Sequence, residues 1–413
     1  MKVAPTLDLE LTAMAHGGSA LGRHEGRVIF VPYAIPGERV RVELVEEHQR
    51  WARARLVEIL RPSPHRVRPP CPYFGQDKCG GCQWQHIDYE EQLRLKAEVM
   101  ADQLQRIGGL EVAVEEPIGA AEPWSYLNHV QFYITEDGHL GFLTADSRDV
   151  IPVEECYIIE PLLDDLWNAL DMYWPQLYRL SLRCGAATGE LMAVFELDHY
   201  EDFDIEVDFP VSCVLLLADG DTAVLMGEPH FREEVAGREY RISAASPFQT
   251  NSGGAEALVT LVRELLAPRG DETLVDVYAG VGLFGLALAG DVGQVIAVEA
   301  HPDAAEDLTY NARDLANVEL RQGEVPDALA GIREPVQLLV LDPPRAGAGE
   351  AVIEELVRLA PGRIAYVSAD PAGLARDARR LVDGGYRLER VQPIDLYPQT
   401  FHIGSVALFV GGS

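Results

Sequence analysis

Lysine, cysteine and long apolar runs are scarce in this chain of 413 residues. Lys2, Lys78 and Lys96 are its only lysines, so arginine supplies almost all of the positive charge. No run of about 18 apolar residues occurs, and the N-terminus carries no signal-peptide pattern. We therefore expect a cytoplasmic protein without a membrane span. Six cysteines in a chain of this length are too few for a disulfide framework.

Basic side chains are outnumbered, because 34 lysines and arginines face 66 acidic residues, for a net charge of −32. Residues 1–70 hold 11 basic and 8 acidic groups, a net charge of +3. Residues 71–230 hold 7 and 31, a net charge of −24, and residues 231–413 hold 16 and 27. Such an acidic middle segment repels RNA unless basic groups gather locally. A solubility trait of the source organism explains the acidity equally well.

The length predicts two or three domains. Alternating apolar residues and glycine turns predict a small β-barrel over residues 1–62, a class that commonly binds oligonucleotides. Residues 63–240 start with a proline-rich linker, show helical spacing from Tyr89 to Ile107, and then carry strand-like runs. They predict an antiparallel α+β middle domain. Over residues 241–413, helices alternate with short apolar strands, which predicts an α/β domain with a parallel sheet.

A glycine-rich loop lies where such a sheet binds its ligand. The segment from Asp276 to Gly285 follows a predicted strand and opens a helix, and its glycines let the backbone approach a ligand. Glu299 ends the next strand, where a carboxylate accepts hydrogen bonds from a ribose diol. A glycine loop alone also fits a dinucleotide enzyme. The DxYxGxG form, followed by AVEA and by DPPR at 342–345, favours S-adenosylmethionine over NAD.

Three cysteines lie within twelve residues, in the pattern Cys71-x7-Cys79-x2-Cys82. Three thiolates do not complete a four-coordinate site, so a fourth ligand must come from elsewhere. Four thiolates suit zinc or a 4Fe–4S cluster, and the spacing does not choose between them. Cys184 and Cys213 lie in apolar, strand-like runs and are predicted to be core residues.

Motifs along most of the chain, from Ala13 to Phe409, resemble the RNA uracil-5-methyltransferase family. In this family a TRAM barrel precedes a Rossmann-like methyltransferase domain. The matching stretches are FVPYAIPGERV, CGGCQWQH, YEEQLRLK, SPFQTN, DVYAGVGLF, NARDLANV, LDPPRAG, YVSADPAGLARD and PIDLYPQTFHI. Their number and order indicate homology.

The resemblance implies two sites. It places S-adenosylmethionine against Gln249, Tyr278, Gly280, Gly282, Glu299, Glu324 and Asp342. It makes Cys156 the fourth ligand beside Cys71, Cys79 and Cys82, and it implies a 4Fe–4S cluster rather than zinc. The alternative for Gln249 and Tyr278 is ordinary packing. The alternative for Asp342 is a cap on the following helix.

The chain departs from the family at the residues that perform its chemistry. The resemblance implies a cysteine nucleophile, which attacks carbon-6 of uracil, at the position of Ala369 in Ser368-Ala369-Asp370-Pro371. It implies a glutamate base two residues after His402, where this chain has Gly404. No cysteine follows Cys213 in the sequence. The arginine of a YRN motif, a family contact to RNA, is replaced by Leu127.

Besides a genuine RNA uracil-5-methyltransferase that acts by an unforeseen mechanism, three functions remain open at this point. The first is a protein that binds S-adenosylmethionine and RNA without methylating uracil. The second is an active methyltransferase on another RNA target, with Asp370, Asp342 or His402 as the base; capping of the helix after Asp370 is the structural alternative for that residue. The third is a binding module without cofactor, against which the glycine loop, Gln249 and Glu299 argue. We expect RNA as the partner, no membrane and a monomer.

Overall fold

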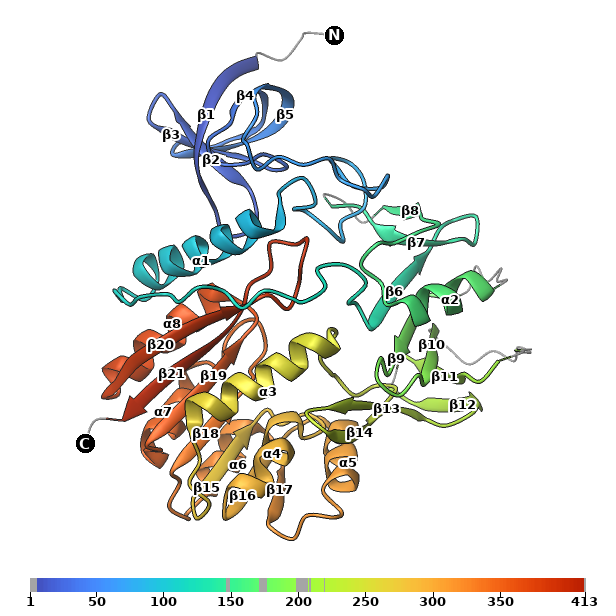
Figure 1. The fold of residues 1–413 in the computed structure, drawn as a ribbon, viewed down its shortest axis with the longest axis vertical. Coiled ribbons are helices and arrows are strands. Elements are labelled where there is room, and N and C mark those ends of the chain that lie inside the picture. The colour runs from blue at the N-terminus through green and yellow to red at the C-terminus, as the bar shows by residue number, and fades with distance from the viewer. Residues whose placement is uncertain are drawn as a thin grey trace.

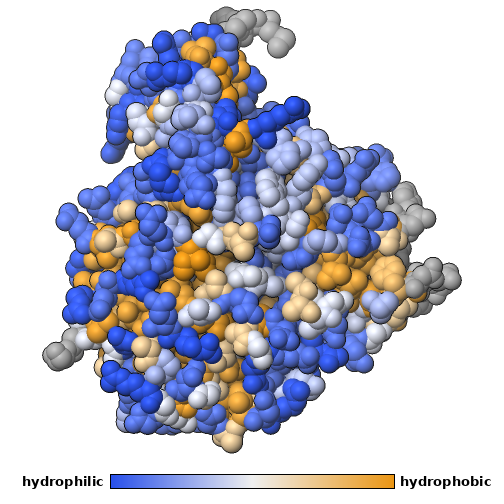
Figure 2. All heavy atoms as spheres, in the orientation of Figure 1, coloured by the Kyte–Doolittle hydropathy of each residue, from blue (hydrophilic) through white to orange (hydrophobic). Residues whose placement is uncertain are grey.

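The computed structural model describes residues 6–145, 149–170, 177–197, 207, 209–218 and 220–411. These residues form a closed barrel, two seven-stranded sheets and a two-stranded hairpin (Figure 1). Among them, no helix is long and apolar enough to cross a membrane. Figure 2 shows hydrophilic residues over much of one face, interspersed with apolar ones.

The N-terminal barrel has the strand order β1-β2-β3-β5-β4. Its strands are β1 Thr6–Met14, β2 Ala20–His24, β3 Arg27–Val31, β4 Arg39–Glu47 and β5 Trp51–Arg61. Alternate residues such as Leu9, Leu11, Val40 and Val42 fill its interior, because successive side chains of a strand point to opposite faces. The predicted small barrel is confirmed.

The middle sheet has the order β12-β11-β10-β9-β6-β7-β8, with α2 Pro161–Ala169 against it. Its strands are β6 His129–Ile134, β7 Leu140–Leu143, β8 Val150–Pro152, β9 Arg179–Cys184, β10 Leu191–Leu197, β11 Ser212–Leu217 and β12 Thr222–Met226. The sheet is not wholly antiparallel as predicted, because β10 and β11 pair in parallel. Residues 198–211 join them, and a connection of that length permits the crossover that parallel strands require. Cys184 and Cys213 lie in its core, as predicted.

The C-terminal sheet has the order β17-β16-β15-β18-β19-β21-β20. Its strands are β15 Thr273–Val277, β16 Gln294–Glu299, β17 Val318–Gln322, β18 Leu338–Leu341, β19 Arg363–Ser368, β20 Tyr386–Ile394 and β21 Gly404–Gly411. The first five are parallel, and β21 runs antiparallel to both β19 and β20. The predicted parallel sheet is thus extended by an antiparallel pair.

Helices cover both faces of this sheet, so its strands are apolar on both sides. Neighbouring residues of β15 belong to opposite cores, Leu274 to one and Val275 to the other. One core includes α6 Val325–Ala330, α7 Glu350–Leu359 and α8 Pro371–Asp383; the other includes α3 Ser252–Leu266, α4 Leu283–Leu288 and the hairpin of β13 His230–Val235 and β14 Arg238–Ser243. Helix α5 Pro302–Asn311 packs on β14, and a 3-10 turn spans Ala289–Asp291.

Helix α1, Tyr89–Arg106, confirms the predicted helix and lies between the barrel and the C-terminal sheet (Figure 1). It begins at Asp88, whose side chain accepts a hydrogen bond from the Glu91 amide. Its Lys96 is buried, and the ammonium group lies 2.6 Å from Asp395 Oδ1 and 3.0 Å from the Tyr397 carbonyl. This buried ion pair ties α1 to the segment between β20 and β21.

Candidate cofactor and acceptor site

The chain reverses its direction of winding between β15 and β18, which are neighbours in the C-terminal sheet. Ligands of open parallel sheets bind at the carboxyl ends of the strands at such a switch point. Asp276 near the end of β15, Glu299 at the end of β16 and Asp342 just after β18 all meet there. The sequence placed Glu299 and Asp342 in the cofactor site, and the fold brings them to one edge.

The glycine loop and Glu299 are held together by backbone hydrogen bonds. The Gly280 amide donates to Glu299 Oε2 at 2.7 Å, and the His301 amide donates to Oε1 at 2.7 Å. Tyr278 and Gly280 have φ values of 60° and 56°. Left-handed backbone is strained for tyrosine, and such strain clusters at ligand sites. Glu324 is exposed at the start of α6, with no capping hydrogen bond from its side chain.

Gln249 and Asp342 form a direct contact, with Gln249 Nε2 donating to Asp342 Oδ2 at 3.0 Å. Burial raises the pKa of Asp342 to about 6, against the opposing effect of this hydrogen bond. Asn128 fixes the neighbouring backbone, because its Nδ2 donates to the Gln249 carbonyl at 3.2 Å. The predicted alternative of a helix cap at Asp342 is wrong, since the next helix begins only at Glu350.

Asp276 belongs to this site, although the sequence reasoning did not select it. Its side chain is fully buried, and Oδ2 accepts a hydrogen bond from the Gly285 amide at 2.7 Å. Oδ1 has no hydrogen-bond partner among the described residues. Burial raises the pKa of Asp276 to about 7, and Asp342 and Glu299 add to the rise. The signal available in the sequence was an acidic residue inside an otherwise apolar strand run.

The two substituted positions lie at neighbouring strand ends. Ala369 follows the last residue of β19, and Gly404 begins β21. A Cβ on Gly404 would lie 2.7 Å from Leu396 Cδ1 and 2.8 Å from the Ile394 carbonyl oxygen. Contacts this short do not occur for real Cβ atoms. The place of the family's base therefore has no room for any side chain without a rearrangement of Leu396 and the backbone.

Asp370 and His402, the remaining predicted candidates for a base, already make polar contacts within the protein. Asp370 caps α8, as the structural alternative predicted, because Oδ1 accepts from the Gly373 amide at 2.7 Å. Its Oδ2 lies 2.9 Å from Nε2 of His16, a barrel residue that sequence reasoning missed. Nδ1 of His402 lies 3.2 Å from Nη1 of Arg345. Burial, and then Arg345, lower the pKa of His402 to about 4.

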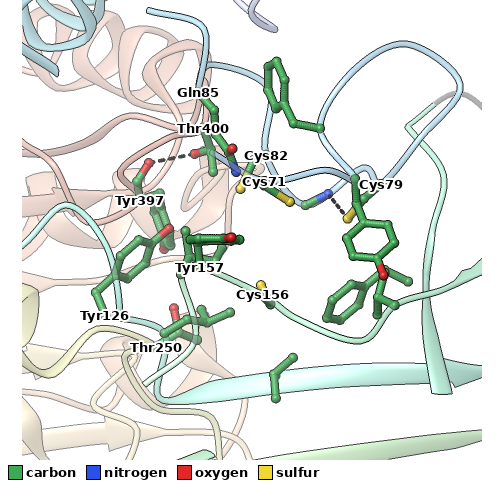
Figure 3. Close-up of a pocket in the computed structure, with 18 of the residues that line it drawn as sticks. Cys71, Cys79, Cys82, Gln85, Tyr126, Cys156, Tyr157, Thr250, Tyr397 and Thr400 are labelled. Atoms are coloured by element: carbon green, nitrogen blue, oxygen red, sulfur yellow. Dashed lines mark hydrogen bonds between the residues drawn. The ribbon is translucent and has the colours of Figure 1, made fainter. Parts of the chain in front are cut away.

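The four predicted metal ligands line one cavity of about 500 Å³ (Figure 3). Cys71, Cys79 and Cys82 come from the loop before α1, and Cys156 comes from the loop before α2. The described residues contain no group of three metal-ligating side chains spaced for a single metal ion. Burial raises the pKa of Cys82, the Gln85 side chain opposes this rise, and the other three cysteines add to it. Burial likewise raises the pKa of Cys156 to about 12.

Residues from the loops before β6 and before α3, and from the loop between β20 and β21, line the other end of this cavity. Tyr126, Thr250, Tyr397 and Thr400 lie on the side away from Cys79 in Figure 3. Thr400 Oγ1 donates to the Tyr397 carbonyl at 2.8 Å. The loop that carries Cys71, Cys79 and Cys82 therefore shares one cavity with the loop between β20 and β21.

The comparisons with known proteins agree with this architecture. Residues 2–57 match the TRAM domain, and residues 229–410 match the family described as tRNA (Uracil-5-)-methyltransferase. A Streptomyces avermitilis protein described as an uncharacterized RNA methyltransferase is 39% identical, over 97% of each chain. A similarly described protein of Thermosynechococcus vestitus is 35% identical, over 98% of this chain and 97% of its own.

A solved structure covers almost the whole chain. The tRNA (uracil-54, C5)-methyltransferase of Pyrococcus abyssi, in complex with S-adenosyl-L-homocysteine, superposes with a TM-score of 0.77 at 26% identity, covering 97% of this chain and 99% of its own. The chain therefore belongs to the TRAM-containing family of S-adenosylmethionine-dependent RNA uracil-5 methyltransferases.

Proposed function

We propose that this protein binds S-adenosylmethionine and RNA but does not methylate carbon-5 of uracil by the covalent route. Gly404 carries the proposal. An added Cβ there would meet the Ile394 carbonyl oxygen at 2.8 Å, so a base at this position would require both Leu396 and this backbone to shift. Ala369 lacks a nucleophile at the neighbouring strand end. The loss of both partners of one mechanism argues against that mechanism.

No other thiol of the chain suits the nucleophile's task. Attack on carbon-6 of uracil requires a thiolate, because the thiol form is a poor nucleophile. Cys184 and Cys213 are buried in the core of the middle sheet. Burial raises the pKa of each cysteine that lines the cavity, so these sulfurs stay protonated at neutral pH unless a metal binds them.

The cofactor half of the site is intact, and this supports binding of S-adenosylmethionine. Gln249 is aligned by Asn128 and touches Asp342 at the switch point. Glu299 is held by two backbone amides at the end of β16, where a ribose would lie. The left-handed backbone of Tyr278 costs free energy, and strain of this kind clusters at ligand sites, so its presence in this loop supports cofactor binding.

We propose RNA as the partner through the barrel rather than through the acidic middle segment. The TRAM match over residues 2–57 supports this assignment. Many barrel arginines are already paired with acidic neighbours, for example Arg27 with Glu47 at 2.7 Å and Arg41 with Asp8 at 3.0 Å. Such pairs leave little free positive charge. We therefore expect weak binding with a shallow salt dependence, because few phosphates would be neutralised.

The four cysteines of the cavity fit a 4Fe–4S cluster, which we include in the proposal. Cys71, Cys79, Cys82 and Cys156 supply four sulfurs around one cavity, a donor set that soft metals prefer. Thiols this reluctant to ionise need a cation to become thiolates, so a metal would stabilise the loop that carries them. Zinc is the alternative. Metal analysis of protein purified without air distinguishes the two.

Incubation with RNA that contains 5-fluorouridine tests the proposed function. A base removes hydrogen from carbon-5 as a proton but cannot remove fluorine as a cation, so an enzyme that attacks carbon-6 and transfers methyl stays covalently attached to the RNA. We expect no attachment that survives denaturation, together with measurable binding of S-adenosylmethionine in the same preparation. A covalent complex that requires S-adenosylmethionine would overturn the proposal.

A further inference from the structure

A histidine in the β1–β2 turn of the barrel contacts the methyltransferase domain at the carboxyl end of β19. His16 lies between β1 and β2, and its Nε2 is 2.9 Å from Oδ2 of Asp370, 354 residues later in the chain. Asp370 directly follows Ala369, the position from which the family's nucleophile is missing. The His16–Asp370 pair therefore lies next to Ala369 in the chain.

The surrounding contacts hold His16 in place. A Cβ added to Gly18 would lie 2.7 Å from Phe401 Cβ, which shows how closely the β1–β2 turn packs on the loop before β21. Trp84 Nε1 donates to the Gly18 carbonyl at 3.2 Å. Arg345 and His402 lie here and contact each other at 3.2 Å, the charge of Lys96 also acts on His402, and the Tyr397 ring lies 5.8 Å from the His402 ring.

We propose that His16, oriented by Asp370, is the proton acceptor for methylation of a base nitrogen in RNA. This inference rests on the proposed function, because it presumes bound S-adenosylmethionine and no covalent step. The acceptor nitrogen attacks the methyl carbon, so that a nitrogen–carbon bond forms and the sulfur–carbon bond of the sulfonium breaks. S-adenosylhomocysteine leaves as a neutral thioether. The proton of the nitrogen passes to His16, and the Asp370 carboxylate stabilises the resulting imidazolium.

His16 suits this role better than the other polar groups at the strand ends. Both carboxylate oxygens of Asp370 are engaged, and Asp342 is bonded to Gln249. His402 faces the positive charge of Arg345, which makes it a poor acceptor of a proton. The His16 side chain is 35% exposed, and its second ring nitrogen has no hydrogen bond to any described residue. A histidine that is held on one nitrogen by a carboxylate and free on the other has the arrangement of a general base.

The chain offers a matched control for a purely structural role. Nδ1 of His65 lies 2.8 Å from Oδ2 of Asp88, and Asp88 also caps a helix, accepting from the Glu91 amide at 2.9 Å. This second pair has the same chemistry and the same capping duty, but it lies at the start of α1. If the His16–Asp370 contact only joins the barrel to the methyltransferase domain, then substitutions in either pair should change the rate of methyl transfer equally.

The test uses the full-length protein, labelled S-adenosylmethionine, and bulk ribosomal and transfer RNA, with products identified as nucleosides. Wild type is compared with His16→Gln, Asp370→Asn, His65→Gln and Asp88→Asn. We expect label on a base nitrogen, a fall in kcat of about 10²–10⁴-fold for His16→Gln, and a smaller fall for Asp370→Asn. Affinity for S-adenosylmethionine and RNA should not change.

The outcomes separate the two proposals. Equal effects in the His16 and His65 variants, or a His16→Gln rate like that of wild type, overturn this inference. An absence of methyl transfer, with S-adenosylmethionine bound, also overturns it while leaving the proposed function standing. Label at carbon-5 of uracil overturns the proposed function, and this inference with it.

Discussion

Because Leu396 packs against Gly404, substitutions at the two positions should have non-additive effects on the free energy of unfolding. The added Cβ of Gly404→Ala would meet Leu396 Cδ1 at 2.7 Å and Cγ at 2.8 Å. Overpacking of this kind typically costs about 1–3 kcal/mol. At about 2–4 °C per kcal/mol for a domain of this size, the melting temperature of the methyltransferase domain should fall measurably.

A double-mutant cycle locates the clash. Leu396 is 4% exposed, so Leu396→Ala alone should cost about 2–5 kcal/mol through the cavity it leaves. In that background Gly404→Ala should cost less than it does alone, a coupling of about 1 kcal/mol or more. The relief should be partial, because the contact to the Ile394 carbonyl at 2.8 Å remains.

Thermal unfolding, followed by circular dichroism, measures each corner of the cycle. The expected result is a destabilised Gly404→Ala protein that Leu396→Ala partly relieves. A Gly404→Ala protein as stable as wild type would show that Leu396 and the backbone accommodate a side chain here. The same clash predicts that Ala369→Cys with Gly404→Glu fails to make 5-methyluridine, and formation of that product would contradict the steric account directly.

Three further predictions concern the buried charges and the cysteines. Lys96→Ala leaves Asp395 buried without its partner and should cost about 3–5 kcal/mol; thermal unfolding with a loss below about 1 kcal/mol would contradict this. Burial holds the pKa of Asp276 at about 7 and of Asp342 at about 6. Both lie above the unfolded value of about 4, so the cofactor-free protein should lose stability as pH rises from about 4 to 7; a melting temperature that rises over this range would contradict it. On the proposed 4Fe–4S assignment, wild type purified without air should be brown and Cys79→Ser colourless; a colourless wild type that contains zinc would contradict that assignment.

The fold was largely predictable because periodicity reflects which faces are buried. Alternation gave the barrel, and apolar runs such as VQLLVLDPP gave the parallel strands, since strands buried on both faces read as continuous apolar segments. The parallel pairing of β10 with β11 was not predictable, because strand direction depends on a long connection that carries no local signal.

The candidate site was only partly predictable. The substitutions at Ala369 and Gly404 are visible in the sequence once the family is recognised. The steric closure around Gly404 is not, because it depends on where Leu396 packs. The contact of His16 with Asp370 joins residues 354 positions apart and follows from how the barrel sits on the sheet. The raised pKa of Asp276 likewise depends on burial.

The substitutions at Ala369 and Gly404 predict that this protein does not make 5-methyluridine. Its most direct test is incubation of the wild-type protein with labelled S-adenosylmethionine and bulk RNA, followed by digestion and identification of the labelled nucleosides. We predict bound S-adenosylmethionine and no label in 5-methyluridine. Label in 5-methyluridine would show that the protein methylates carbon-5 of uracil despite Ala369 and Gly404.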